Sequence, residues 1–189
     1  MPKGKGGMGF RDIEAFNIAM LAKQCWRLIH NTYSLFYRVH KSKYFPTCSF
    51  MEANLGNNPS YVWRSLLAAR EVIKEGLMWK VGDGSPTQVS NHKWLPNRPM
   101  FLGTPTPQMY VNELINRATM QWDREKIFDL FAYRTRMDIL SIPLGSNSAR
   151  DVLVWKENKS QTFIVKLAYE VACKLKETTR VEHHAIALV

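Results

Sequence analysis

Basic side chains recur at helical spacing in the first quarter of the chain, where they could contact phosphate. Lys23, Arg27 and His30 are spaced i, i+4 and i+7, so they would share one face of a helix. Lys and Arg contact nucleic-acid phosphates through charge, without reading base sequence. The candidate contact residues, which we call the basic strip, are Lys23, Arg27, Arg38, Lys41 and Lys43. Two further candidates are Arg64 and Arg70. They belong to a later expected helix, and they would join the basic strip only if that helix packs beside it.

The overall charge agrees with such a partner without proving it. The net charge is +10, and residues 1–95 hold 13 Lys and Arg against 6 Asp and Glu, whereas residues 96–189 hold 13 against 10. A basic surplus attracts polyanions, so RNA or single-stranded DNA is the partner we expect, bound in the N-terminal half. An ordinary solvated helix face is the alternative, because charge runs also serve solubility.

Catalytic and cofactor sites have no support in the sequence. Polymerases hold two metal ions between paired carboxylates, and no two acidic residues are adjacent here. Asp12 with Glu14, and Asp123 with Glu125, fit the first turns of helices instead. The segment GKGGMG at residues 4–9 lacks the preceding strand and the Gly-Lys-Ser/Thr of a phosphate-binding loop. We therefore expect no enzyme activity, no cofactor and no small-molecule substrate.

Metal and membrane sites are not expected either. Cys25, Cys48 and Cys173 lie far apart, and the pair His183-His184 follows the last periodic segment without converging ligands. Lys23 interrupts the one long apolar stretch, which is then too short to span a membrane. We expect an intracellular protein of the nucleus or cytoplasm, with the mitochondrion left open.

The tryptophans allow two interpretations. Rings can stack on nucleic-acid bases, but Trp26 and Trp63 fall on the apolar sides of their expected helices. We expect both to be core residues.

Periodicity predicts a mostly helical α+β fold. Helices are expected from Asp12 over about five turns, from Ser34 to Pro46, and from Ser60 to Gly76. Shorter helices are expected at residues 111–118 and 123–131, and a closing helix at 166–177. Two short β-hairpins are expected, one at residues 79–89 around Gly82-Asp83-Gly84 and one at 152–165.

Proline placement suggests a domain boundary. Four prolines within residues 95–107 indicate an irregular linker. The expected regions are a flexible N-terminus (1–11), a helical region with a hairpin (12–94), the Pro-rich linker (95–110), a small α+β region (111–178) and a tail (179–189).

Three blocks of residues carry a family resemblance. KGGMGFRDIEAFNIAMLAKQCWRLI at residues 5–29, SYVWRSLLAAREVIKEGLMWKVGDGS at 60–85 and KWLP at 93–96 resemble plant non-LTR, LINE-type retrotransposon reverse transcriptase polyproteins. The resembling segment follows the polymerase palm. A weaker block, Asp151, Trp155, Val165, Lys166, Ala168 and Tyr169, resembles the start of the zinc-binding region of those polyproteins.

The resemblance implies a truncated, retrotransposon-derived protein without polymerase, endonuclease or ribonuclease H centres. The sequence departs from the family where Ser90, Asn91 and His92 replace Trp-x-Asp, and no zinc-ligand set follows the third block. Any retained activity would be sequence-tolerant nucleic-acid binding. The alternative is a functionless or partner-binding helical remnant with no nucleic-acid role.

Overall fold

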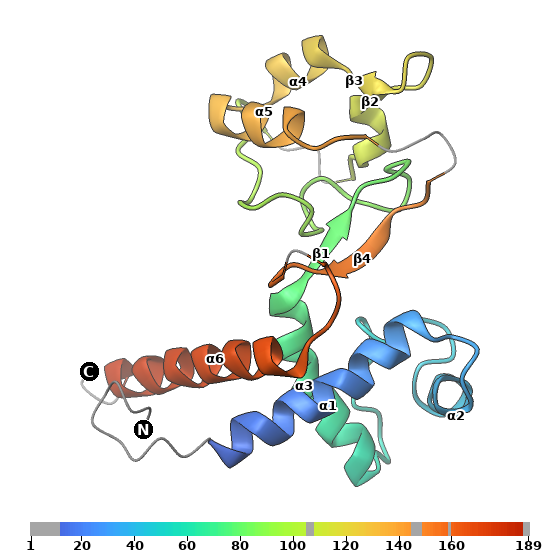
Figure 1. The fold of residues 1–189 in the computed structure, drawn as a ribbon, viewed down its shortest axis with the longest axis vertical. Coiled ribbons are helices and arrows are strands. Elements are labelled where there is room, and N and C mark those ends of the chain that lie inside the picture. The colour runs from blue at the N-terminus through green and yellow to red at the C-terminus, as the bar shows by residue number, and fades with distance from the viewer. Residues whose placement is uncertain (1–11, 105–107, 145–148, 159, 187–189) are drawn as a thin grey trace. The chain divides into compact units, whose positions relative to one another are not determined.

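Two compact units make up the protein. The computed structural model describes residues 12–104, 108–144, 149–158 and 160–186, with side chains as far as residue 180. Unit 1 comprises the described parts of Met1–Gly76 and Glu157–Val189, and unit 2 is Leu77–Lys156. Most of the described elements are helices, and the strands form two small antiparallel sheets (Figure 1). This confirms the expected α+β, mostly helical class. The expected flexible segment, residues 1–11, lies outside the described residues.

Unit 1 is helical, and its first three helices begin where the sequence predicts. They are α1 (Ile13–His30), α2 (Leu35–Tyr44) and α3 (Tyr61–Gly76). Each starts after a polar residue whose side chain accepts a backbone N–H of the first turn: Asp12, Ser34 or Ser60, at 3.0 to 3.2 Å. Such caps satisfy donors that a helix start otherwise leaves unpaired.

Small side chains let α1 lie close against its neighbours α3 and α6 (Val165–Ile186) (Figure 1). Ala15, Ala19, Ala22 and Cys25 recur every three or four residues on the buried face of α1. The Cys25 thiol donates to the carbonyl of Leu66 at 3.2 Å, and burial raises its pKa to about 12. Cys25 is therefore a packing residue, protonated at neutral pH.

A polar contact ties the start of α1 to α6. The Lys176 ammonium lies 2.9 Å from the Asp12 carboxylate and 2.5 Å from that of Glu14. The backbone N–H of Asp12 also donates to the Tyr169 hydroxyl. Helix α6 runs further than the expected 166–177, so residues 183 and 184 belong to a helix and not to a tail.

Trp63 is the centre of the unit 1 core, as expected, whereas Trp26 is not. Trp63 is fully buried, stacks on Tyr44 at 4.5 Å between ring centroids, and donates its indole N–H to the Asn54 carbonyl. Trp26 is only half-buried and stacks on His30 at 3.9 Å. The prediction of a core Trp26 was wrong because its helix buries the small residues beside it instead.

Unit 2 is built around a long-range strand pair. Strand β1 (Leu77–Lys80) pairs antiparallel with β4 (Val152–Trp155), Leu77 facing Trp155 and Lys80 facing Val152. The two expected hairpins at 79–89 and 152–165 are therefore wrong. Each contributes one strand to a single sheet, and α6 begins at Val165 where a return strand was expected.

Asp151 explains why Gly82-Asp83-Gly84 is not a hairpin turn. Its carboxylate accepts the backbone N–H groups of Gly82 and Gly84 at 2.6 and 2.8 Å, and the Thr87 hydroxyl. A Cβ on Gly82 would lie 2.3 Å from the Ala149 carbonyl oxygen, so only glycine fits. The loop is therefore held by a side chain from the far end of unit 2.

The other elements of unit 2 are short. Residues 111–118, expected to be one helix, form a 3-10 turn (Val111–Leu114) followed by β2 (Ile115–Asn116), which pairs with β3 (Gln121–Trp122). The expected second helix is α4 (Arg124–Leu130), capped by Asp123. Helix α5 (Tyr133–Leu140) was not predicted.

The Pro-rich segment is part of unit 2 and does not separate two units. The Met100 N–H donates to the Thr135 hydroxyl, and the Met100 carbonyl accepts the Ala132 N–H. Chain divisions fall near residues 76 and 157 instead of 95–110. Fully buried residues of the unit 2 core include Val89, Val111, Leu114, Ile127, Phe131 and Ile139.

Replacing Trp63 by Ala should destabilise the protein by about 3–5 kcal/mol, because a fully buried ring leaves a cavity. Replacing the half-buried Trp26 by Ala should cost about 1–2 kcal/mol. Urea denaturation followed by circular dichroism measures both. Equal losses would show that Trp26 supports the core as much as Trp63 does.

The Asp12–Lys176 contact predicts a pH-dependent stability. The hydrogen bond from Lys176 lowers the pKa of Asp12 below its usual 3.8. The ionised Asp12 carboxylate therefore stabilises the folded protein above about pH 4, and this stabilisation is lost as the pH falls further. The carboxylates of Glu14 and Asp12 raise the pKa of Lys176. The stabilisation from its ammonium is therefore present at neutral pH and is lost only in strong alkali. Lys176→Met should therefore reduce unfolding free energy at pH 7 but hardly at about pH 2.5.

The exposed Lys174, on the same helix, provides the matched control Lys174→Met, which should change stability little at either pH. Urea melts at the two pH values make the comparison. A deficit of Lys176→Met that is the same at both would mean that the alkyl chain, and not its charge, holds α6 to α1.

Candidate nucleic-acid interface

Most of the predicted phosphate-contacting residues are exposed in unit 1. Helix α1 carries Lys23 and Arg27, α2 carries Arg38 and Lys43, and α3 carries Arg64. Within the described residues none of the five forms an ion pair. Arg27 only donates to the neighbouring Gln24 side chain, at 3.1 Å. These five, which we call the open cations, keep their charge available to a polyanion.

Two predicted contact residues are engaged inside the protein. The half-buried Arg70 guanidinium donates to the carbonyls of Phe50 and Ala53, and so fixes the turn before α3. The Lys41 ammonium donates to the Cys48 carbonyl at 2.7 Å and lies over the Phe45 ring. Arg70 therefore has a structural role that its position on the helix did not reveal. Lys41 would have to break its hydrogen bond to the Cys48 carbonyl before it could contact a phosphate.

Exposed aromatic rings accompany the open cations. Tyr33, between α1 and α2, is 94% exposed, and Tyr61 at the start of α3 is 87% exposed. The Arg64 guanidinium lies 5.9 Å from the centre of the Tyr61 ring. Sequence reasoning missed both tyrosines, although Tyr61 precedes Arg64 by one helical turn, a spacing that brings side chains together.

The half-buried Trp26 adds a third ring near the end of α1. Its ring centre lies 3.9 Å from that of His30, at 21° between planes, and 5.6 Å from that of Phe163. Arg27 follows Trp26 directly in the helix. Charge beside partly open rings is the combination with which proteins hold single strands without sequence preference, because every base has a stacking face.

A small pocket adjoins one open cation. It has a volume of about 240 Å³ and is lined by Lys43, Tyr44, Leu55, Asn57 and Asn58 with Gly56. The Tyr44 hydroxyl donates to the Ser60 hydroxyl at 2.8 Å, and this bond together with Lys43 lowers the Tyr44 pKa. The pocket offers amide and ammonium donors, which suit an oxygen-rich ligand such as phosphate or sugar.

No site for a catalytic metal is visible in the described part of the chain. The described residues contain no group of three or more His, Cys, Asp or Glu side chains that could hold an ion. They also contain no helix long and apolar enough to cross a membrane.

Two Arabidopsis thaliana proteins are similar to this chain. An uncharacterized mitochondrial protein is 43% identical over 104 residues, which are 55% of this chain and 64% of that protein. A putative ribonuclease H protein is 28% identical over 188 residues, which cover 90% of this chain and 29% of that protein. The chain thus spans less than two thirds of either relative. No family model and no solved structure matches it.

The purified chain should incorporate no nucleotide on a primed RNA template with Mg²⁺ or Mn²⁺. Two-metal transfer needs carboxylates that converge on both ions, and no adjacent acidic pair exists in the sequence. Primer extension above a no-protein control would overturn this expectation.

Proposed function

We propose that this protein is a retrotransposon-derived, reverse-transcriptase-like segment that binds RNA or single-stranded DNA through its phosphates and does no polymerase chemistry. The observation that carries the proposal is the set of five open cations on three helices of one unit, unpaired within the described residues and accompanied by exposed rings. Net charge alone would be weaker support, because charge also serves solubility.

The two plant relatives support the origin in this proposal. One is named a putative ribonuclease H protein, and nearly the whole of this chain aligns with less than a third of it. We infer that this chain corresponds to a nucleic-acid-holding portion of such a longer protein. The mitochondrial relative makes the mitochondrion a location to test, alongside the nucleus and cytoplasm.

Binding of this kind is driven by released counterions. Each phosphate neutralised by Lys or Arg frees condensed cations, so affinity falls steeply with salt and depends little on base sequence. The exposed rings of Tyr33 and Tyr61 add stacking to whichever base lies over them. The expected ligand is therefore a flexible single strand whose bases are free to stack.

Replacing Lys23 and Arg27 together by Gln should lower the magnitude of the log–log salt slope for single-stranded RNA by roughly 1 to 1.5, since each phosphate contact contributes about −0.7. Filter binding or fluorescence anisotropy from about 50 to 200 mM salt measures the slope. The far-ultraviolet circular dichroism spectrum should not change, because both side chains are exposed.

The matched control is Lys174→Gln with Arg180→Gln, two exposed cations of α6 that are not open cations as defined above. This pair should leave the slope nearly unchanged. Equal losses from both pairs would mean that net charge alone attracts the strand. No salt-dependent binding by the unaltered chain would favour a remnant with no nucleic-acid role.

A further inference from the structure

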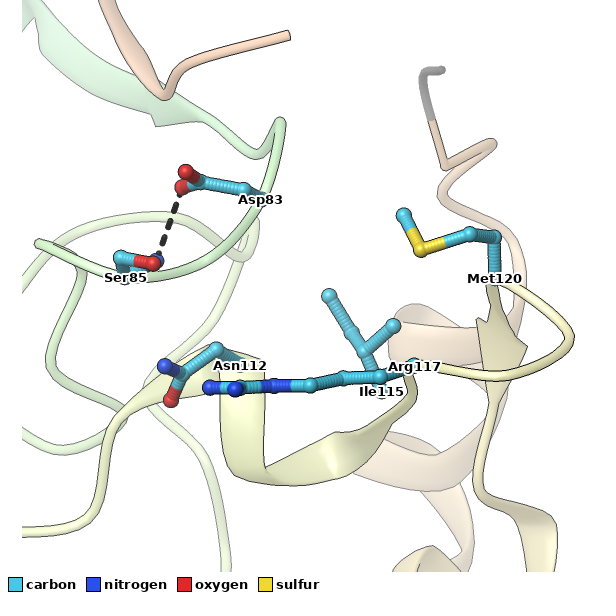
Figure 2. Close-up of a pocket in the computed structure, with 6 residues that line it drawn as sticks. All are labelled: Asp83, Ser85, Asn112, Ile115, Arg117 and Met120. Carbon is cyan, nitrogen blue, oxygen red and sulfur yellow. Dashed lines mark hydrogen bonds between the residues drawn. The ribbon is translucent and has the colours of Figure 1, made fainter. Parts of the chain in front are cut away.

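A polar pocket of unit 2 lies where the Asp151-bound loop faces the turn between β2 and β3. Its volume is about 340 Å³, and it is lined by Asp83, Ser85, Asn112, Ile115, Arg117 and Met120. Figure 2 shows the Arg117 side chain extended toward Asn112, with Met120 across from Asp83 and Ser85. A pocket of this size can hold one nucleotide or a comparably small ligand.

The loop and the turn that form the pocket are both fixed by hydrogen bonds. The loop donates to Asp151, and its Gly84 carbonyl also accepts a hydrogen bond from the Asn112 backbone N–H at 3.0 Å. Gly84 has a φ of +70°, and a Cβ there would lie 2.5 Å from the Asn112 nitrogen. Across the pocket, the Asn116 side chain accepts the N–H groups of Ala118 and Thr119, which shapes the turn carrying Arg117.

The polar groups of the pocket are largely uncommitted. One Asp83 oxygen accepts the Ser85 N–H at 3.0 Å, and no bond within the described residues occupies the other. Arg117 and the Asn112 side-chain amide likewise make no hydrogen bond or ion pair there. Asp83 and Arg117 carry opposite charges and line one pocket, yet they lie too far apart to pair. A ligand with a donor edge at one end and an anion at the other would satisfy both.

We propose that this pocket binds a guanine nucleotide unit, with the base edge against Asp83 and the phosphate against Arg117. A carboxylate offers only acceptors. Among the common bases, guanine alone presents two adjacent N–H donors on its pairing edge. Adenine and cytosine place a ring-nitrogen acceptor beside their single amino group, and uracil flanks its N–H with carbonyls, so each would set an acceptor against the carboxylate.

The other lining residues suit the remaining surfaces of the ligand. The Asn112 amide can donate to the guanine carbonyl, and the Arg117 guanidinium forms charge-assisted bonds with phosphate oxygens. Ile115, 7% exposed, and the half-buried Met120 supply apolar contact for a flat ring. This site goes beyond the proposed function, since it lies in unit 2 and involves no open cation. It also adds a small-molecule partner to a protein for which no small-molecule substrate is expected.

Calorimetric titration of the full chain with guanosine, adenosine, cytidine and uridine 5′-monophosphates tests the proposal. The guanine nucleotide should bind at least about tenfold more tightly than the others, the loss expected when charge-assisted bonds to Asp83 are missing. Arg117→Gln should weaken it about tenfold while leaving the affinity for guanosine unchanged. No preference for guanine would overturn the proposal, and so would tighter binding of glycine, a zwitterion that also presents a cation and an anion.

Asp83→Asn gives a readout that a purely structural role would not produce. The amide oxygen can still accept the Ser85 N–H, while the second carboxylate oxygen, an acceptor, is replaced by an amide NH₂, which is a donor. The variant should lose about tenfold in affinity for the guanine nucleotide and gain affinity for xanthosine monophosphate, which has a carbonyl where guanine has an amino group. Loss of both ligands with an unchanged circular dichroism spectrum would overturn the assignment of Asp83.

The matched controls are Asp129→Asn and Arg124→Gln, exposed charges on α4 that do not line the pocket. Neither should change binding, and an equal effect would contradict a local site. Two single-stranded heptamers, one with a single central guanine and one without, separate the sources of the ligand. Tighter binding of the guanine heptamer than of the guanine-free one, with the difference lost in Asp83→Asn, assigns the pocket to a strand, and equal binding of the two heptamers assigns it to the free nucleotide.

Discussion

The carboxylate of Asp151 is the contact on which unit 2 depends. It binds Gly82, Gly84 and Thr87, more than sixty residues earlier in the chain, and it directly precedes β4, the strand that pairs with β1. One side chain thereby closes the sheet and sets the loop that carries Asp83. Because Gly82 and Gly84 have no room for a Cβ, the loop can approach its partners only with glycines at both positions. The candidate nucleotide pocket is a consequence of this closure.

Unit 1 depends on close helix packing. The small residues of α1 face α3 and α6, so the helix buries alanines and leaves its long basic side chains in solvent. Lys23 and Arg27 are open for this reason, and Trp26 is only half covered. Arg70 is half-buried, and its guanidinium is held by the carbonyls of Phe50 and Ala53. Packing thus selects which of the basic residues remain available to a phosphate.

Local signals in the sequence predicted the first three helices of unit 1 well and the sheet poorly. Asp12, Ser34, Ser60 and Asp123 each cap a helix that begins where the sequence predicts, because capping involves neighbours within one turn. The partner of β1 lies more than seventy residues away, and no local pattern reveals such a pairing. Asp-Gly therefore indicated a hairpin where a distant carboxylate holds the loop. The polar residues of the pocket were missed for the same reason, since they converge from separate segments.

The most direct test of nucleic-acid binding by unit 1 is ultraviolet cross-linking of the full chain to single-stranded RNA, with mass spectrometry of the joined peptides. Cross-links form where bases lie against side chains, so they show where the strand lies on the protein, which an affinity alone does not. If unit 1 binds the strand, cross-linked peptides should come from α1, α2 and α3, near Trp26, Tyr33 and Tyr61. Cross-links confined to α6, or none under conditions of measurable binding, would contradict it.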